Sequence, residues 1–311
     1  MKMALILLPS LLVHAVGVRV DGQTMTRPNT VVVRSGTLQL RALRWQPEGR
    51  GPFPAILFCH GSGPTDPSRA QTIGPVFAKH GYVFLYLFRR GDGLSAGQGT
   101  FIGDLLGRER KTKGDDAANQ LQVRLLETDQ LDDALAGLDY LRVLPVVDAR
   151  RIGVVGHSFG GSLTLLLAER DNSLRSAVDF AGGAVSWHRS SYLRERLISA
   201  VRRLTTPIFF IHAANDFSIT PGEVLNTEMA HLGKAHELKV FPAVGRTADD
   251  GHNFIYLAIG MWEHDLFAFL EKHMNIQGKM AQPTNLRIRA ARRSKPLLPA
   301  ADKPPHNSGL N

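Results

Sequence analysis

The stretch from residue 151 to residue 163 constrains the fold of this chain more than any other part. An apolar run ends at Val155, the pentapeptide Gly156-His157-Ser158-Phe159-Gly160 follows, and a second apolar run extends from Leu163 to Ala168. This order predicts a strand, a sharp turn and a helix, with the Ser158 hydroxyl presented at the turn as in a nucleophile elbow. Glycines two residues to either side of the serine let the strand and the helix pass closely. The pentapeptide alone would also fit an ordinary glycine-rich loop, but the two apolar runs favour the elbow.

Apolar runs alternate with helical patterns along the rest of the chain. Strands are predicted at residues 54–59, 82–88, 175–181 and 207–213, with a hairpin at 30–33 and 37–45 and a short strand at 238–241. Helices are predicted at 69–80, 125–144 and 255–273, with a further helix capped by Thr220 and carrying Pro221 in its first position. Strands that are apolar throughout, alternating with helices, indicate an α/β fold with a mostly parallel central sheet and helices on both faces. In such sheets the functional groups gather beyond the carboxyl ends of the strands.

Three segments interrupt this alternation. Residues 96–124 contain several glycines and a charged cluster from Arg108 to Asp116, which predicts an irregular excursion, either a lid over the site or a solvated loop. Residues 184–203 are predicted to form a second, partly helical excursion, and residues 245–252 a loop. With these segments included, residues 23–276 are expected to form one catalytic domain, because α/β domains of this size often stay undivided.

The beginning of the chain has the pattern of a signal peptide. Lys2 is followed by a mainly apolar run to Val18, which predicts a signal peptide over residues 1–22 with cleavage after Ala15 or Gly17. The run is shorter than the ~20 residues of a membrane-spanning helix, so no stable membrane span is expected. We therefore expect an exported protein, periplasmic or secreted. An uncleaved anchor or a misassigned start are the alternatives, and without a cleaved signal peptide the expected location is the cytoplasm.

Composition adds two further observations, one on the charge of the chain's end and one on the single cysteine. Most of the net charge of +9 lies in the tail, residues 277–311, which has no apolar period and is predicted to be disordered. A basic tail can bind an anionic surface but is more often a solvated extension, and no nucleic-acid partner is expected. Cys59 lies in an apolar strand and is predicted to be a buried apolar side chain. One cysteine excludes an intramolecular disulfide.

Two residues downstream of Ser158 could complete a catalytic set. A serine hydroxyl is a weak nucleophile at neutral pH and needs a base, which in turn needs an orienting acid. When the serine lies in such an elbow, the acid and then the histidine follow it along the chain. His252 lies in a loop after the last predicted strand and is the candidate base. Asp216 follows strand 207–213 and is the candidate acid, although a capping role in the next turn would also explain it.

Other histidines and aspartates fit these roles less well. Asp249 and Asp250 are close to His252 in sequence, but neighbours in a loop tend to point apart. His212 lies inside a predicted strand and is interpreted as a core histidine. His188 lies in the excursion at residues 184–203, where it could contact a substrate.

Acyl transfer also needs two N–H donors for the oxyanion. The N–H of Phe159, the residue after the nucleophile, is expected to be one. The other is expected in His60-Gly61-Ser62-Gly63, which follows an early strand; Ser62 N–H is preferred, with Gly61 as the alternative. The glycine-rich segment 89–93 lacks the pattern of a nucleotide-binding motif. It is interpreted as a structural turn whose arginines pair with nearby carboxylates or carbonyls. No metal-ligand spacing is found, so neither a metal nor a cofactor is expected.

Taken together, these motifs resemble those of the α/β-hydrolase superfamily. The resemblance rests on His60-Gly61-Ser62-Gly63, on Arg90-Gly91-Asp92-Gly93-Leu94-Ser95, on the elbow around Ser158, on Asn215-Asp216 and on Gly251-His252-Asn253-Phe254. It covers about residues 35–275 and is strongest to dienelactone hydrolase-like and prolyl-oligopeptidase-like catalytic domains. Two departures stand out. The elbow carries Ser158 where the archetypal dienelactone hydrolase has cysteine, and the chain has no room for the propeller that precedes prolyl-oligopeptidase domains.

The resemblance and the candidate residues lead to one expected function and two alternatives. We expect a serine hydrolase that cleaves a carboxylic ester or related small-molecule acyl substrate through an acyl-enzyme, with Ser158, Asp216 and His252 as the triad. One alternative keeps the triad but acts on short peptides or amides. The other is a non-catalytic binding protein on a hydrolase scaffold, since fold does not fix function.

Overall fold

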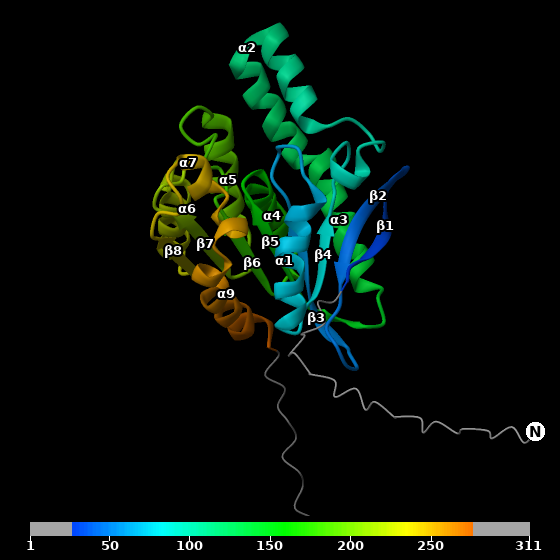
Figure 1. Ribbon diagram of the computed structural model, residues 1–311. Helices are drawn as coiled ribbons and strands as arrows, with labels where there is room; N and C mark the ends of the chain where they lie inside the picture. Colours follow the sequence, from blue (N-terminus) through cyan, green and yellow to red (C-terminus); the bar gives the residue numbers. More distant parts are fainter. Residues whose placement is uncertain (1–26, 276–311) are drawn as a thin grey trace, which may run out of the picture. The chain divides into compact units, whose positions relative to one another are not determined.

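The computed structural model describes residues 27–275 of the chain (Figure 1). Within this range an eight-stranded sheet forms the centre of the molecule. The predicted signal peptide, residues 1–22, and the predicted tail, residues 277–311, lie outside the described residues. Both therefore stay predictions.

The central sheet is mostly parallel, as predicted. Its strands are β1 (Asn29–Ser35), β2 (Leu38–Trp45), β3 (Phe53–Cys59), β4 (Val83–Leu87), β5 (Val147–His157), β6 (Ser176–Phe180), β7 (Ile208–Ala213) and β8 (His236–Phe241). They lie in the order β1-β2-β4-β3-β5-β6-β7-β8. The pairs β1–β2 and β2–β4 are antiparallel, and every other neighbouring pair is parallel.

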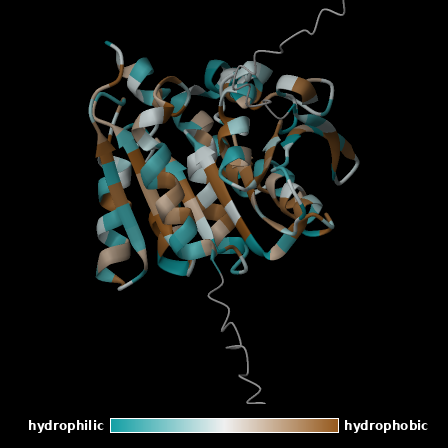
Figure 2. Cartoon of the chain, turned by 60° about the horizontal axis from the view of Figure 1, so that its bottom comes forward, coloured by the Kyte–Doolittle hydropathy of each residue, from teal (hydrophilic) through white to brown (hydrophobic). Residues whose placement is uncertain are grey.

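Helices cover both faces of this sheet. One face is covered by α1 (Pro67–Lys79), α8 (Phe254–Leu257) and α9 (Ile259–Met274), and the other by α3 (Asp129–Arg142), α4 (Phe159–Arg170), α5 (Ser191–Arg203) and α6 (Thr220–His231). Side chains alternate along each strand, so each strand feeds both cores. In β3, for example, Leu57 packs into one core and Phe58 into the other. Figure 2 shows the apolar residues that run along the strands between the two helical layers.

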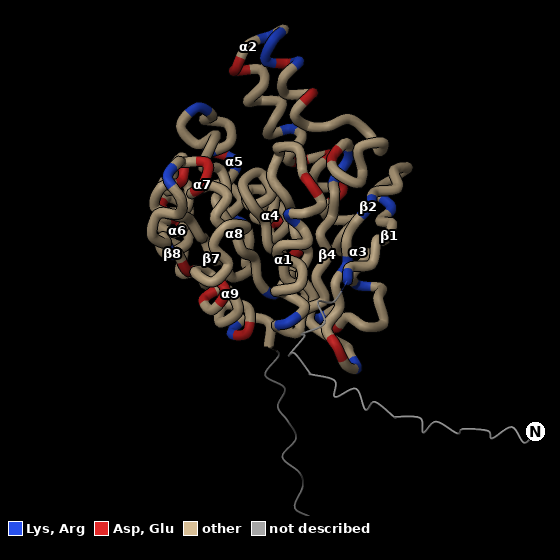
Figure 3. The backbone as a smooth tube through the Cα atoms, in the orientation of Figure 1, with Lys and Arg blue, Asp and Glu red and all other residues tan. Residues whose placement is uncertain are grey.

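Residues 96–124, predicted to be irregular, are largely helical. After the short 3-10 turn η1 (Gly93–Ser95), helix α2 extends over Ile102–Glu127, broken at Gly114, where φ is 88°. The half after the break is held by burial of Ala118, Leu125 and Leu126. In the half before it Ile102 is buried, but the residues from Gly107 to Lys113 are mostly exposed and carry charges of both signs (Figure 3). The prediction failed because the glycines and charges suppress the apolar period that reveals a helix from sequence.

Several element boundaries also differ from those predicted. The predicted helix 125–144 is the end of α2 plus α3, separated at Thr128, and the predicted helix 255–273 is divided into α8 and α9. α6 begins at Thr220, with Ile219 rather than Thr220 at its cap. The predicted loop 245–252 ends in a short helix, α7 (Ala248–His252). A capping box explains α7, because the Thr247 and Asp250 side chains each accept from the other residue's backbone N–H.

The excursion at residues 184–203 consists of turns followed by α5, which Ser190 caps by accepting a hydrogen bond from Leu193 N–H. None of the helices within residues 27–275 combines the length and the apolar character needed to cross a membrane.

Candidate active site

Ser158 lies between β5 and α4 in a left-handed backbone conformation, with φ 58° and ψ −119°. This conformation is strained for a residue with a side chain and is typical of functional turns. The Ser158 N–H donates to the Phe180 carbonyl oxygen of β6 at 2.8 Å, which ties the turn to the neighbouring strand. The structure thus contains the strand, sharp turn and helix that the sequence predicts around this serine.

The two glycines that flank Ser158 stand where backbone segments pass too closely for any side chain. A Cβ at Gly160 would overlap the carbonyl oxygen of Cys59, at the end of β3. A Cβ at Gly156 would overlap the carbonyl oxygen of Gly160. The elbow therefore depends on glycine for clearance between β3, β5 and α4.

Replacement of Gly160 with alanine is expected to lower the free energy of unfolding by about 3 kcal/mol, because overpacking forces the backbone apart. Gly63→Ala is the matched control, since no atom lies within 4 Å of a Cβ at that position in the loop after β3. Urea denaturation of the two variants measures the difference. Equal stability of both would contradict the steric argument.

The structure brings Ser158, His252 and Asp216 together. His252, the last residue of α7, places its Nε2 2.8 Å from Ser158 Oγ. Its Nδ1 lies 2.8 Å from Asp216 Oδ1, in the turn after β7. Asp250, by contrast, accepts hydrogen bonds from the backbone N–H groups of Arg246 and Thr247. The residue set singled out as nucleophile, base and acid is thus one continuous hydrogen-bonded chain.

The partners of His252 fix which of its nitrogens carries the proton. An ionised carboxylate only accepts hydrogen bonds, so Nδ1 must donate to Asp216. The lone pair of Nε2 is then directed at the Ser158 hydroxyl, which is the arrangement a general base needs. Burial raises the pKa of Asp216, but hydrogen bonds from His212 and His252 outweigh this effect and hold the pKa below its ordinary value.

His212 was interpreted as a core histidine, and it is fully buried in β7. It also contacts the site: its Nδ1 lies 3.0 Å from Asp216 Oδ2, so the carboxylate accepts from two imidazoles. The sequence carries one signal for this contact, which is the spacing of the two residues. His212 lies four residues before Asp216, across the end of a strand.

His157, inside the elbow pentapeptide, is a second histidine whose contact the sequence did not predict. Its Nε2 donates to the backbone carbonyl oxygen of His252 at 2.8 Å. Burial, assisted by the neighbouring His252 ring, lowers the pKa of His157 to about 3. A neutral imidazole therefore ties the elbow to the end of α7.

Phe159 and Ser62, whose N–H groups are the two candidate oxyanion donors, line the same cavity as Ser158. Phe159 N–H begins α4, and Ser62 N–H lies in the loop after β3. Neither amide donates a hydrogen bond to another of the described residues, as expected for groups kept for a ligand. Gly61 packs against Ser158: a Cβ at position 61 would lie 3.5 Å from Ser158 Cβ.

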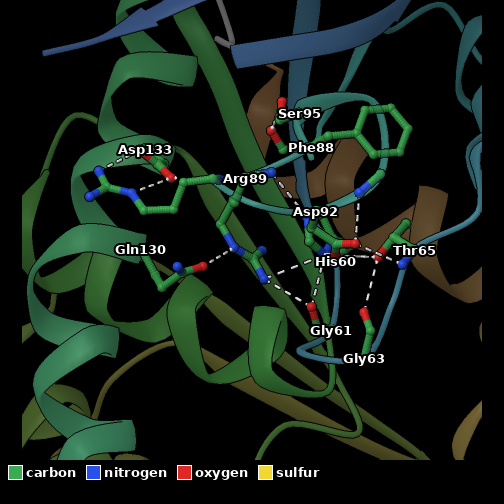
Figure 4. A network of polar contacts seen from close by, with 12 residues as sticks. His60, Gly61, Gly63, Thr65, Phe88, Arg89, Asp92, Ser95, Gln130 and Asp133 are labelled. Carbon is green, nitrogen blue, oxygen red and sulfur yellow. Dashed lines mark hydrogen bonds and ion pairs between the residues drawn. The ribbon is translucent and has the colours of Figure 1, made fainter. Parts of the chain in front are cut away.

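The loop after β3 is held by the turn after β4 (Figure 4). The Thr65 N–H and hydroxyl both donate to the Asp92 carboxylate at 2.9 Å. Arg90 forms ion pairs with Asp129 at 2.8 Å and Asp133 at 2.7 Å. The prediction of a structural turn with paired arginines is confirmed.

A cavity of about 230 Å³ opens beside Ser158. It is bounded by both halves of α2, the start of α4, the turns before α5 and the start of α5. Its lining combines apolar side chains with polar ones and two arginines: Ser62, Gly103, Leu106, Arg110, Gln122, Ser158, Phe159, Ser162, Gly183, Val185, Ser186, Arg189 and Leu193. Both excursions therefore contribute walls to it. His188, predicted as a possible substrate contact, is not among the residues that line this cavity, and its Nε2 lies 3.0 Å from Ser218 Oγ.

Cys59 lies under the elbow and is only 2% exposed, as predicted. Burial raises the pKa of its thiol to about 12. Among residues 27–275, no three His, Cys, Asp or Glu side chains cluster so that they could hold a metal ion.

Comparison with protein families gives a match that spans most of the sheet and the site. The model described as "Dienelactone hydrolase family" matches residues 40–255. This range contains the elbow, the turn after β7 and α7.

The individual relatives share either a low sequence identity with this chain or only part of their own length. "Esterase EstD" of Thermotoga maritima is 33% identical over 129 residues, which cover 41% of this chain and 26% of that protein. The chain therefore aligns with about a quarter of this relative's length. The structure of an acylaminoacyl peptidase from Pyrococcus horikoshii is similar with a TM-score of 0.58 and 17% identity, covering 82% of this chain and 43% of that one. A dienelactone hydrolase from Anabaena variabilis has a TM-score of 0.58 and 15% identity, covering 81% and 100%. At such identities the two structures establish a common fold.

Proposed function

We propose that this chain, which belongs to the dienelactone hydrolase family, is a serine hydrolase that cleaves a small carboxylic ester through an acyl-enzyme. Membership of the family supports hydrolase activity. The observation that carries the proposal is the continuous hydrogen-bonded chain from Asp216 through His252 to Ser158, which itself lines a cavity. The fold alone would not support it, because hydrolase scaffolds also serve other functions.

In the proposed reaction Ser158 Oγ attacks the ester carbonyl carbon while His252 Nε2 takes the hydroxyl proton. Asp216 holds the imidazole and stabilises its charged form. The negative oxygen of the tetrahedral intermediate is bound by the N–H groups of Phe159 and Ser62. His252 then gives its proton to the leaving alcohol, and the C–O bond breaks to leave an acyl-Ser158 ester. Water, deprotonated by His252, attacks this ester. The bond between the acyl carbon and Ser158 Oγ then breaks as His252 returns the proton to Oγ, and the acid is released.

The cavity favours a short acyl group. Its volume of about 230 Å³ is below the ~300–1,000 Å³ of sites that enclose drug-sized ligands. The Leu106, Val185 and Leu193 side chains supply apolar walls, and Arg110 and Arg189 lie at its polar side. A compact ester with a polar group fits this lining better than a long alkyl chain.

A fluorophosphonate probe tests the proposal directly. We expect native protein to form a covalent adduct that peptide mass spectrometry maps to Ser158, and heat-unfolded protein to form none. p-Nitrophenyl acetate should be hydrolysed faster than p-nitrophenyl decanoate, and both faster than an acetylated amino-acid p-nitroanilide. Faster cleavage of the anilide would favour the amide alternative. If the native protein forms no adduct, the alternative that remains is a non-catalytic binding protein.

A further inference from the structure

Arg89 is a buried cation without an acidic partner in contact. The residue is 1% exposed, and its guanidinium forms no ion pair with any described carboxylate. Its Nε donates to Gln130 Oε1 at 2.7 Å and its Nη2 to the Gly61 carbonyl oxygen at 2.9 Å (Figure 4). Nη1 is buried and has no partner among the described residues. Burying a charge in this way costs several kcal/mol, so the arrangement calls for an explanation.

His60 supplies a second donor to the same carbonyl. Its Nε2 lies 3.1 Å from the Arg89 backbone N–H, which can only donate, so Nε2 must be the unprotonated nitrogen. The proton is then on Nδ1, whose nearest acceptor is the Gly61 carbonyl oxygen at 2.8 Å. Burial and the Arg89 charge lower the pKa of His60 well below its ordinary value, which keeps this ring neutral.

The Gly61 carbonyl belongs to the same planar peptide unit as the Ser62 N–H. In a trans peptide the two groups point in opposite directions, so fixing the oxygen fixes the direction of the N–H. Two donors on the oxygen also polarise the peptide and strengthen the N–H as a donor. Arg89 also contacts the side chain of the residue that carries the other candidate donor, since its guanidinium carbon lies 5.5 Å from the centre of the Phe159 ring.

We propose that Arg89 is a positioning residue for the oxyanion site. It anchors the Gly61 carbonyl oxygen so that Ser62 N–H is aimed at the developing oxyanion. Its positive charge also stabilises that oxyanion without contacting it. This inference rests on the proposed function. It goes beyond the triad because Arg89 is not itself among the residues that line the cavity, and among the described residues it forms no hydrogen bond with Ser158. It also accounts for the unpaired charge, because an acidic partner in contact would cancel the positive potential at the site.

The test compares Arg89→Met, which keeps an unbranched apolar side chain, with Arg196→Met. Arg196 lies on α5 and forms ion pairs with Glu127 and Glu169, away from the oxyanion loop. We expect Arg89→Met to lower kcat for p-nitrophenyl acetate and the rate of fluorophosphonate labelling about 100-fold, with little change in KM. Affinity for a benzeneboronic acid, which forms a tetrahedral adduct with serine, should fall by a similar factor. Arg196→Met should change melting temperature and leave these four quantities unchanged.

Arg89→Lys keeps the experiment decisive if Arg89→Met does not fold. Lysine retains the charge but not the planar fork, so a loss between that of the methionine variant and wild type is expected. Wild-type kcat and boronate affinity in a folded Arg89 variant would overturn the inference. So would a fall in boronate affinity no larger than the change in KM, because that indicates a general structural role. Failure of the proposed function is distinguishable, since wild-type protein itself would then neither label nor hydrolyse the ester.

Discussion

Replacing Ser158 with alanine is expected to lower kcat for ester hydrolysis by about 10⁶-fold and to abolish fluorophosphonate labelling. The loss is this large because Ser158 Oγ is the atom that would form the acyl bond, with His252 Nε2 2.8 Å away to take its proton. His252→Ala should fall in the same range, since the base and the nucleophile act as one unit. The double variant should be no slower than either single variant. Initial rates with p-nitrophenyl acetate measure all three.

Ser173→Ala is the control, because Ser173 is an exposed serine in the turn between α4 and β6, remote from the elbow. It should keep wild-type kcat and labelling. A Ser158→Ala protein that folds and retains most of the activity would show that another group attacks the ester. Multiplicative losses in the double variant would show that Ser158 and His252 act independently.

The largest expected effect on stability concerns Asp179, a buried carboxylate in β6. Burial raises its pKa to about 7, with Asp216 adding to the rise and His212 and Gly182 N–H opposing it. Its ordinary value is 3.8, so between these two pH values the folded chain binds a proton that the unfolded chain does not. The stabilisation that protonated Asp179 gives the folded chain is complete below pH 3.8 and is lost as the pH rises to about 7. Over that window the loss amounts to about 4 kcal/mol.

Asp179→Asn removes this titration. The variant should gain stability relative to wild type as the pH rises from about 4 to about 7, and the difference should then stay constant. Comparing the two proteins by urea denaturation cancels the contributions of other groups, such as Asp216 and Asp171, whose lowered pKa values act in the opposite direction. Parallel stability curves for the two proteins would contradict the assignment of a raised pKa to Asp179.

The parts of the fold that follow local rules could be predicted from sequence. Strands β3, β4, β6 and β7 and the second half of β5 consist mainly of buried residues. A strand with two buried faces is expected to be apolar along most of its length. The elbow was also predictable, because the glycines around Ser158 have a steric reason. The grouping of Ser158, Asp216 and His252 followed from chain order together with the rule that strand ends gather at one edge of a parallel sheet.

What could not be predicted depends on contacts between distant segments. α2 contains a helix break at Gly114 and a charged first half, and only its packing on the body of the protein reveals the second half as helix. The apolar pattern around His212 indicates only that this side chain is buried. A buried histidine can also contact Asp216, and the pattern carries no information on that contact. The contact of Arg89 with Gly61 joins residues 28 positions apart, and no local pattern encodes it.

The burial of Cys59 has a practical consequence. It is the only cysteine in the chain, and its thiol stays protonated at physiological pH and out of reach of solvent. Thiol-reactive reagents are therefore expected to leave the unmodified protein unlabelled. A reporter cysteine placed at the exposed Lys111, in the charged half of α2, would carry a fluorophore at one defined position. If the proposed acyl-enzyme forms, the emission of this fluorophore should change as the acyl group binds next to the first half of α2, which contributes Arg110 to the cavity wall.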